Sequence, residues 1–156
     1  MDSELNMRPF SILLIEDNPA HSDLAVEALR DVKIHVDVHV VNTGEKALDY
    51  LYNEGEYSNS IKPDLILLDL NLPGINGKEV LVQIKNEPSL KCLPVVILTT
   101  SEAESDILST YNQFASCYIK KPVDFDEFFS AIQQLTEFWF TLVRLPAEKC
   151  DAKLRY

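Results

Sequence analysis

Five short apolar runs divide the chain, and four of them are continuous rather than alternating. Continuous apolar strands are typical of a parallel sheet whose two faces are both covered. Segments with apolar residues at helical spacing lie between the runs, so strand and helix alternate five times. This pattern predicts an α/β fold built on a parallel sheet. The runs are Ile12–Ile15, Val36–Val41 (the alternating one), Leu65–Leu68, Val95–Leu98 and Tyr118–Ile119.

The expected helices have recognisable starts. Thr43 is placed as the N-cap of the second helix, and Asp124 with Glu127 three residues later forms a capping box before the last one. The segment 53–63 is polar and is expected to be an exposed loop. We expect helices over Ser22–Val32, Glu45–Tyr52, Lys78–Lys85 and Glu102–Phe114, and a final helix from Asp124.

The composition limits the possible partners. A formal net charge of −11 disfavours binding to nucleic acid and to anionic lipid, because both are negatively charged themselves. No apolar run approaches the roughly 18–20 residues that a membrane-spanning helix needs. The N-terminal sequence MDSELNMRPF is no secretory signal, and the three cysteines form no CxxC pair. We therefore expect reduced thiols and a cytoplasmic location.

Polar residues stand at the ends of four of the apolar runs. Glu16 and Asp17 follow the first run, Asp69 the third, Thr99 the fourth and Lys121 the fifth. Because the carboxyl ends of parallel strands meet at one edge of a sheet, we expect these side chains to converge there. A lone carboxylate at the tip of a buried strand would be costly, so Asp69 needs a neutralising partner or has a chemical role.

A divalent cation is the natural neutraliser of clustered carboxylates. Oxygen ligands favour Mg²⁺, with Mn²⁺ as a substitute, and Mg²⁺ usually takes one or two protein carboxylates and keeps several waters. A carboxylate such as Asp69 can attack phosphorus and form an aspartyl phosphate. Lys121 would then stabilise charge on the phosphoryl oxygens, and Thr99 would hydrogen-bond one of them. The pattern predicts a phosphoryl-transfer site centred on Asp69.

A Mg²⁺-dependent phosphatase with an aspartyl nucleophile is the main alternative. Such enzymes commonly place a second Asp two residues after the first, but this chain has Asn71 there, and an amide cannot exchange protons as a carboxylate does. Asn71 therefore favours a phosphoaspartate that persists. Nucleotide-binding enzymes are disfavoured because the four glycines form neither a GxGxxG motif nor a P-loop.

The ordered motifs resemble the receiver domains of two-component response regulators, over about Phe10 to about Thr136. The resemblance implies a doubly wound (βα)5 flavodoxin-like fold with strand order 2-1-3-4-5. Glu16 stands where Asp is commoner, a departure that concerns only the metal geometry. The motifs are the acidic pair Glu16–Asp17, Asp69 followed by Pro73 and Gly77, the Thr99 hydroxyl, and Lys121–Pro122.

The same resemblance implies roles for single residues. Asp69 would be the phosphoacceptor, loaded by a partner sensor histidine kinase, while Thr99 and Tyr118 match the switch hydroxyl and the switch aromatic residue. Catalysis by the chain would be limited to its own phosphorylation and slow autodephosphorylation. An inert pseudo-receiver would lack Asp69 or Lys121, and both are present. The implied metal ligands are Glu16 (through water), Asp17, Asp69 and Asn71 (through its backbone carbonyl).

Three stretches are similar to the stand-alone response regulators paired with cyanobacterial phytochromes. They are GEYSNSIKPDLILLDLNLPGINGKEVL, PVVILTTS and FWFTLVRLP. This similarity implies a phytochrome-type sensor kinase as partner and no output domain. We expect an N-terminal extension over 1–9, a receiver domain over 10–145 that includes a long C-terminal helix, and a tail over 146–156.

The last helix carries more apolar side chains than one core-facing stripe can bury. The stripe consists of Phe125, Phe128, Ile132, Leu135, Trp139 and Leu142. We expect the side chains left over to form a homodimer interface. The alternative is a chain that bends after Phe140 and folds its tail back onto its own domain. The expected interface residues are Phe129, Phe138, Phe140 and Val143.

Several other residues receive plainer interpretations. His21, His35 and His39 lie apart in the sequence and are interpreted as ordinary helix or strand residues. Lys120 is expected to face outward, unlike its neighbour Lys121. For Tyr118, the alternative to a switch is a half-buried packing residue of the fifth strand.

Overall fold

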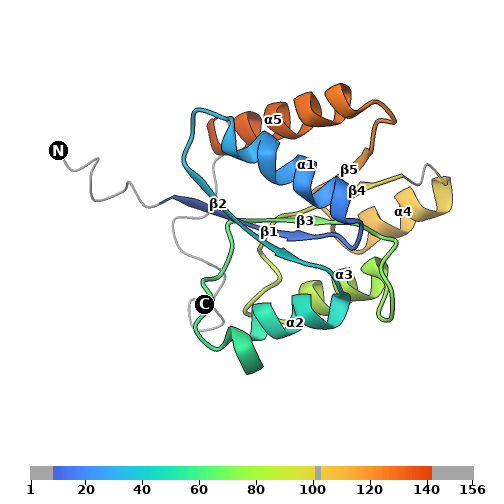
Figure 1. The fold of residues 1–156 in the computed structure, drawn as a ribbon. Helices are drawn as coiled ribbons and strands as arrows, with labels where there is room; N and C mark the ends of the chain where they lie inside the picture. Colours follow the sequence, from blue (N-terminus) through green and yellow to red (C-terminus); the bar gives the residue numbers. More distant parts are fainter. Residues whose placement is uncertain (1–8, 101–102, 142–156) are drawn as a thin grey trace.

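The computed structural model describes residues 9–100 and 103–141. Five parallel strands form one sheet in the order β2-β1-β3-β4-β5, which confirms the predicted fold class and strand order (Figure 1). The strands are β1 (Phe10–Ile15), β2 (Val36–Val41), β3 (Leu65–Leu68), β4 (Val95–Thr99) and β5 (Cys117–Lys120). The helices are α1 (Pro19–Arg30), α2 (Gly44–Tyr52), α3 (Gly77–Asn86), α4 (Glu104–Asn112) and α5 (Phe125–Thr141), with the 3-10 helix η2 (Gly55–Tyr57) after α2.

Helices cover both faces of the sheet, with α1 and α5 on one side and α2 and α3 on the other (Figure 1). Successive residues of a strand point to opposite faces, so both neighbours in a central strand are buried. On β3, Leu65 and Leu67 pack toward α1 and α5, whereas Ile66 and Leu68 join the opposite cluster. This double burial explains the continuous apolar runs, and each such side chain contributes about 1.5–3 kcal/mol.

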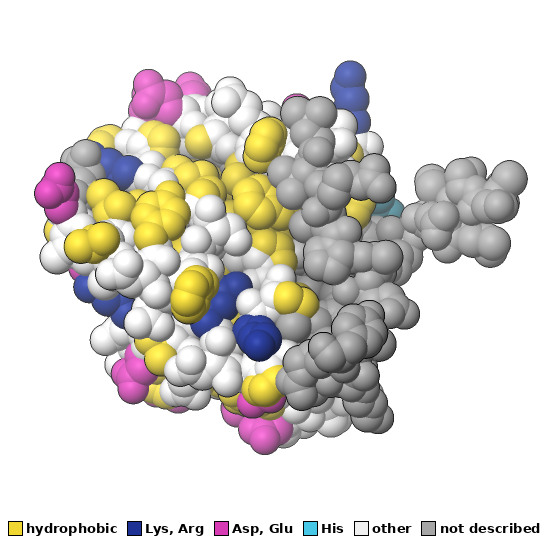
Figure 2. Space-filling model, turned by 180° about the vertical axis from the view of Figure 1, so that it is seen from behind, with side chains coloured by type: hydrophobic (Ala, Val, Ile, Leu, Met, Phe, Trp, Pro, Cys, Tyr) yellow, Lys and Arg dark blue, Asp and Glu magenta, His cyan; other side chains and the backbone are white. Residues whose placement is uncertain are grey.

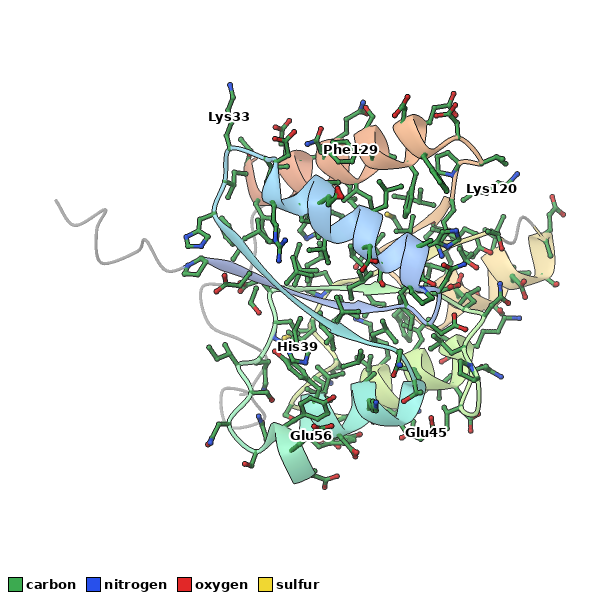
Figure 3. All side chains as sticks on the ribbon, viewed as in Figure 1. Lys33, His39, Glu45, Glu56, Lys120 and Phe129 are labelled. Atoms are coloured by element: carbon green, nitrogen blue, oxygen red, sulfur yellow. The ribbon has the colours of Figure 1, made fainter. Side chains whose placement is uncertain are left out.

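The edge position of β2 explains its alternating sequence. It pairs only with β1 in the sheet order, and its burial alternates over most of its length. His39 on this strand packs against Tyr50 and Tyr57, with ring centroids 4.6 Å and 5.6 Å apart (Figure 3). These contacts confirm the interpretation of His39 as an ordinary strand residue.

Side-chain caps set the starts of α1, α2, α3 and α5. The Thr43 hydroxyl accepts the N–H of Lys46 at 3.0 Å, and the Asp124 carboxylate accepts the N–H of Glu127 at 3.1 Å, so both predicted caps are confirmed. The start of α1 was predicted three residues too late. Asn18 caps this helix, and Pro19 occupies its first position, where a missing N–H costs nothing.

The end of α4 and the core-facing stripe of α5 also differ from the prediction. The predicted helix over Glu102–Phe114 is shorter, because α4 ends at Asn112 and Phe114 has a left-handed φ of 68°. At the start of α5, Phe125 is 61% exposed, so its place in the core-facing stripe is wrong. The helix joins the core only from Phe128 onward. The stripe residue Leu142 lies outside the described residues.

Cysteine chemistry also differs from the expectation. Cys117 is a free thiol, but Cys92 is disulfide-bonded, so the expectation of reduced thiols throughout is wrong. Among the helices that the structure describes, none has the length and apolar character needed to cross a membrane.

Candidate functional site

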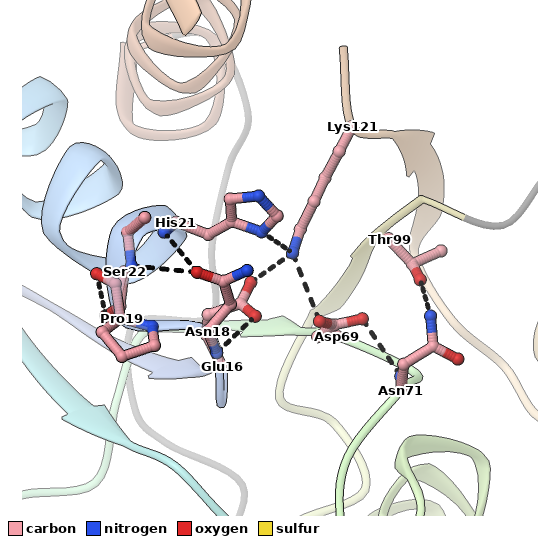
Figure 4. Close-up of polar contacts among 10 residues, drawn as sticks. Glu16, Asn18, Pro19, His21, Ser22, Asp69, Asn71, Thr99 and Lys121 are labelled. Atoms are coloured by element: carbon pink, nitrogen blue, oxygen red, sulfur yellow. Dashed lines mark hydrogen bonds and ion pairs between the residues drawn. The ribbon is translucent and has the colours of Figure 1, made fainter. Parts of the chain in front are cut away.

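The strand ends bring the predicted residues to one edge of the sheet (Figure 4). Thr99 is the last residue of β4, while Glu16, Asp69 and Lys121 directly follow β1, β3 and β5. Backbone hydrogen bonds extend the sheet by one residue at each of these positions. The N–H of Asp69 donates to the Ile15 carbonyl at 3.0 Å, and the N–H of Lys121 donates to the Thr99 carbonyl at 2.7 Å. The sheet itself therefore positions these side chains.

Lys121 lies at the centre of the site, and its side chain is only 3% exposed. Its ammonium forms an ion pair with Glu16 Oε1 and contacts Asp69 Oδ2 at 3.2 Å. A third contact joins Nζ to Nδ1 of His21 at 3.0 Å. Lys120 is exposed and points away from the site, as predicted (Figure 3).

Glu16, Asp17 and Asp69 form the carboxylate cluster that the sequence predicted. One oxygen from each lies within 4.8 Å of the others. Glu16 and Asp69 are buried, whereas Asp17 is exposed. Burial raises the pKa of Glu16 to about 7; the nearby Lys121 acts against this rise and the Asp69 carboxylate adds to it. Three carboxylate oxygens this close fit a hard divalent cation, because the cation would remove their mutual repulsion.

Asn71 links the other side of Asp69 to Thr99. The N–H of Asn71 donates to Asp69 Oδ1 at 3.1 Å, and its side-chain amide donates to Thr99 Oγ1 at 3.5 Å. Thr99 is fully buried, whereas Thr100 is exposed, so the structure favours Thr99 as the hydroxyl of the site. The two oxygens of Asp69 thus have different surroundings: a backbone amide on one and an ammonium on the other.

A glycine brings α3 against the backbone of the site. At Gly77, a Cβ atom would lie 2.4 Å from the Asp69 carbonyl oxygen and 2.6 Å from Leu70 Cα. The Gly77 N–H also donates to the Leu70 carbonyl at 3.0 Å. Only a residue without a side chain fits this close approach, which explains the glycine at the first position of α3.

Tyr118 is a residue of β5, and Asp69 follows β3. The strand β4 lies between these two strands in the sheet. Its side chain is partly buried and packs against the core cluster on the α2 and α3 side. Its backbone N–H donates to the Tyr111 hydroxyl of α4 at 3.1 Å. Tyr118 is therefore coupled to α4 as well as to the sheet.

His21 also belongs to the site and is not among the residues that the sequence predicted there. Its interpretation as an ordinary helix residue is wrong, because its imidazole contacts Lys121. The signal was the dipeptide Asn18–Pro19, an N-cap followed by a residue suited to the first helical position. This start puts His21 in the first turn of α1, directly after the acidic pair.

The expected interface residues on α5 lie in different environments. Phe138 is 50% exposed. Phe129 is partly buried and lies beside α1 (Figure 3). Phe140 is also partly buried and stacks on Phe10 of β1, with ring centroids 4.1 Å apart. Val143 lies outside the described residues.

Comparisons with known proteins agree with this geometry. The response regulator receiver domain family matches residues 12–133. Response regulator Rcp1 from Synechocystis sp. is 43% identical over 139 residues, which are 89% of this chain and 95% of Rcp1. The crystal structure of the phosphorylated cyanobacterial phytochrome response regulator RcpA has a TM-score of 0.87 and 44% identity, covering 90% of this chain and 100% of that one.

The Mn²⁺-bound form of Rcp1 is similar too, with a TM-score of 0.85, 43% identity, and coverage of 89% of this chain and 100% of that chain. The family match spans most of the chain and includes the edge of the sheet at which the carboxylates, Thr99 and Lys121 meet. The chain therefore belongs to the receiver domains of response regulators, the proteins that accept a phosphoryl group in two-component signalling.

Proposed function

We propose that Asp69 is the residue of this receiver domain that accepts the phosphoryl group, from the phosphohistidine of a sensor kinase. One observation carries the proposal: at the carboxyl edge of the sheet, the Asp69 carboxylate contacts a buried ammonium and clusters with two further carboxylates. In the transfer, an Asp69 oxygen bonds to phosphorus and the P–N bond to the donor imidazole breaks. The imidazole nitrogen keeps the electron pair and takes up a proton.

Receiver domains bind a divalent metal, and we propose Mg²⁺ here, with Mn²⁺ as a substitute. Glu16 (through water), Asp17, Asp69 and the backbone carbonyl of Asn71 would hold it. When bound, the cation supplies positive charge that neutralises the phosphoryl oxygens. Lys121 would add to this charge by turning one N–H from Asp69 to a phosphoryl oxygen.

Phosphorylation with a small donor tests the proposal. With Mg²⁺ and labelled acetyl phosphate, the chain should gain one phosphoryl group that is stable in acid and labile in alkali. Chelation of the metal should prevent the gain. A label that is stable in alkali, or that appears equally with the metal chelated, would contradict an aspartyl phosphate formed at this site.

Thr99 and Tyr118 are proposed as the switch. Thr99 Oγ1 would leave the Asn71 amide for a phosphoryl oxygen, and Tyr118 would rotate into the vacated space. The result would be a population shift over α4, β5 and α5 rather than a new fold. Figure 2 shows the back of the molecule relative to Figure 1, and on this face hydrophobic side chains gather around basic ones. On α4, the side chain of Leu108 is 63% exposed.

Thr99→Ala should accept the phosphoryl group but show a reduced conformational response, because it has no hydroxyl to bond a phosphoryl oxygen. Backbone NMR shifts before and after phosphorylation measure the response. Thr100→Ala is the matched control, since its hydroxyl belongs to the exposed neighbour, and it should respond as the wild type does. A full response in Thr99→Ala would exclude this coupling.

We also propose which type of kinase phosphorylates this chain. The similarity to RcpA and Rcp1 supports a phytochrome-type sensor kinase. A cytoplasmic location belongs to the same proposal, because the chain must meet the kinase in the compartment where its phosphohistidine forms. We further propose that residues 10–145 act as the receiver unit, flanked by 1–9 and 146–156.

Self-association through α5 is proposed from Phe138, an aromatic side chain that is 50% exposed near the C-terminal end of the helix. Phe138→Asp should shift the protein from dimer to monomer at tens of micromolar in sedimentation, because a charge would enter an apolar contact. Phe125→Asp is the control, since this phenylalanine is also exposed on α5 but lies at its other end. A monomeric wild type, or a dimer that survives Phe138→Asp, would refute the interface.

A further inference from the structure

His21 contacts the site from a helix rather than from a strand end. It is the third residue of α1, and its Nδ1 lies 3.0 Å from Lys121 Nζ (Figure 4). We propose that His21 is a positioning residue for Lys121. The neutral imidazole of His21 holds the Lys121 ammonium beside Asp69. This inference rests on the proposed role of Asp69 as the phosphoacceptor.

The direction of the hydrogen bond follows from the chemistry of the two groups. An ammonium has three N–H donors and no acceptor, so Nδ1 of His21 must accept and the imidazole proton must be on Nε2. Glu16 and Asp69 accept the other two donors. All three N–H groups of Lys121 thus have partners, which fixes the ammonium within the buried site.

The imidazole is held in place from two sides. The backbone N–H of His21 donates to the Asn18 side chain at 3.2 Å, in the cap of α1. The ring meets Phe128 of α5 edge to face, with centroids 5.8 Å apart. A surface pocket of about 360 Å³ borders both rings. His21 therefore connects the site to the first turns of α1 and α5.

A neutral ring suits this position. Burial lowers the pKa of His21, and the Lys121 ammonium lowers it further, while the carboxylates of Asp69 and Asp17 act in the opposite direction. Phe128, which faces the ring from α5, carries no charge. Protonation of Nδ1 would remove the acceptor and place two cations side by side, so Lys121 would move away from His21.

The contact should matter most during phosphoryl transfer. One N–H of Lys121 must then turn from Asp69 to a phosphoryl oxygen, while Glu16 and His21 keep hold of the other two. Loss of a hydrogen bond to a charged group should slow transfer by about tenfold or more if it is felt in the transition state.

The contact itself can be tested without phosphorylation. In the metal-free protein, ¹⁵N NMR should find Nδ1 of His21 unprotonated at pH 8, and titration should find its pKa below the ordinary 6.5. Adding Lys121→Met to a Glu16→Gln background should raise that pKa, because the nearby cation is lost. A proton on Nδ1 at pH 8, or a pKa that ignores Lys121, would overturn the contact.

Variants test the role in transfer. With Mg²⁺ and acetyl phosphate at pH 8, His21→Leu should be phosphorylated about tenfold more slowly than the wild type, at unchanged fold by circular dichroism. His21→Asn places an amide oxygen near the Nδ1 position and should recover most of the loss. His35→Leu is the control and should match the wild type, because this histidine is exposed and lies beside Asp37 instead of Lys121.

The pH profile separates positioning from a structural effect. The ratio of the wild-type rate to the His21→Asn rate should fall as the pH is lowered through the His21 pKa, because only the histidine can be protonated. Changes in the donor and in Glu16 cancel in this ratio. A constant ratio, or a His21→Leu rate equal to that of the wild type, would refute the positioning role even where Asp69 is phosphorylated normally.

Discussion

Asp69→Asn should leave no detectable phosphoryl group after treatment with Mg²⁺ and acetyl phosphate, whereas Asp64→Asn should be labelled as the wild type is. An amide has no anionic oxygen to attack phosphorus, so the chemical step fails outright in Asp69→Asn. The backbone N–H of Asn71 and the ammonium of Lys121 would remain in place. Liquid chromatography with mass spectrometry of the intact chain measures the outcome.

Asp64 is a demanding control for this experiment. It lies at the other end of β3, is also buried at 8% exposure, and would fall in the same proteolytic peptide as Asp69. Its Oδ2 accepts the N–H of Ser11 at 2.8 Å, and an Asn side-chain oxygen can still accept this bond. Label retained in Asp69→Asn but lost in Asp64→Asn would move the phosphoacceptor to the opposite edge of the sheet.

The convergence of the site could be predicted because it depends on topology alone. Once the continuous runs indicate parallel strands, the residues after each strand must meet at one edge. Asp69, Thr99 and Lys121 therefore needed no knowledge of side-chain conformation. The cap at Thr43 was equally local, since it depends on a hydroxyl three residues before an available N–H.

The parts that the sequence did not reveal depend on contacts between distant elements. His21 joins the site because the start of α1 passes beside the loop that follows β5, a relation that no helical periodicity contains. Phe125 fits the apolar spacing of α5, yet the helix reaches the core only one turn later. Phe140 stacks on Phe10, which lies 130 positions earlier in the sequence, at the start of β1.

Lys121→Met is expected to destabilise the metal-free protein strongly at pH 8 and much less at pH 5. Removing one partner of a buried ion pair leaves an uncompensated charge, with a typical cost of about 3–5 kcal/mol. Here the charges left behind are the buried carboxylates of Glu16 and Asp69. Urea denaturation in the presence of a metal chelator measures the free energy of unfolding.

The pH dependence follows from Glu16. In the folded wild type its pKa is raised from 4.5 to about 7, so the folded state binds this proton more tightly than the unfolded state does. Stability from this group is therefore fully present below pH 4.5 and declines as the pH rises toward 7. Loss of Lys121 removes an influence that lowers this pKa, so in the variant the decline continues to higher pH and is larger in total. At pH 5, a proton on Glu16 relieves most of the repulsion.

Two variants distinguish charge from packing. In Glu16→Gln/Lys121→Met, one of the two unpaired carboxylates is gone and Asp69 no longer faces a second charge, so part of the stability lost in Lys121→Met should return at pH 8. Lys85→Met is the control: its ammonium bonds the Leu93 and Lys91 carbonyls at 2.6 Å and 2.9 Å instead of carboxylates. Its cost should be similar at pH 5 and pH 8, because the lowered pKa of about 8 leaves Lys85 at least half protonated across this range. If Lys121→Met loses the same stability at both pH values, the buried ammonium holds the site by packing and not by neutralising Glu16 and Asp69.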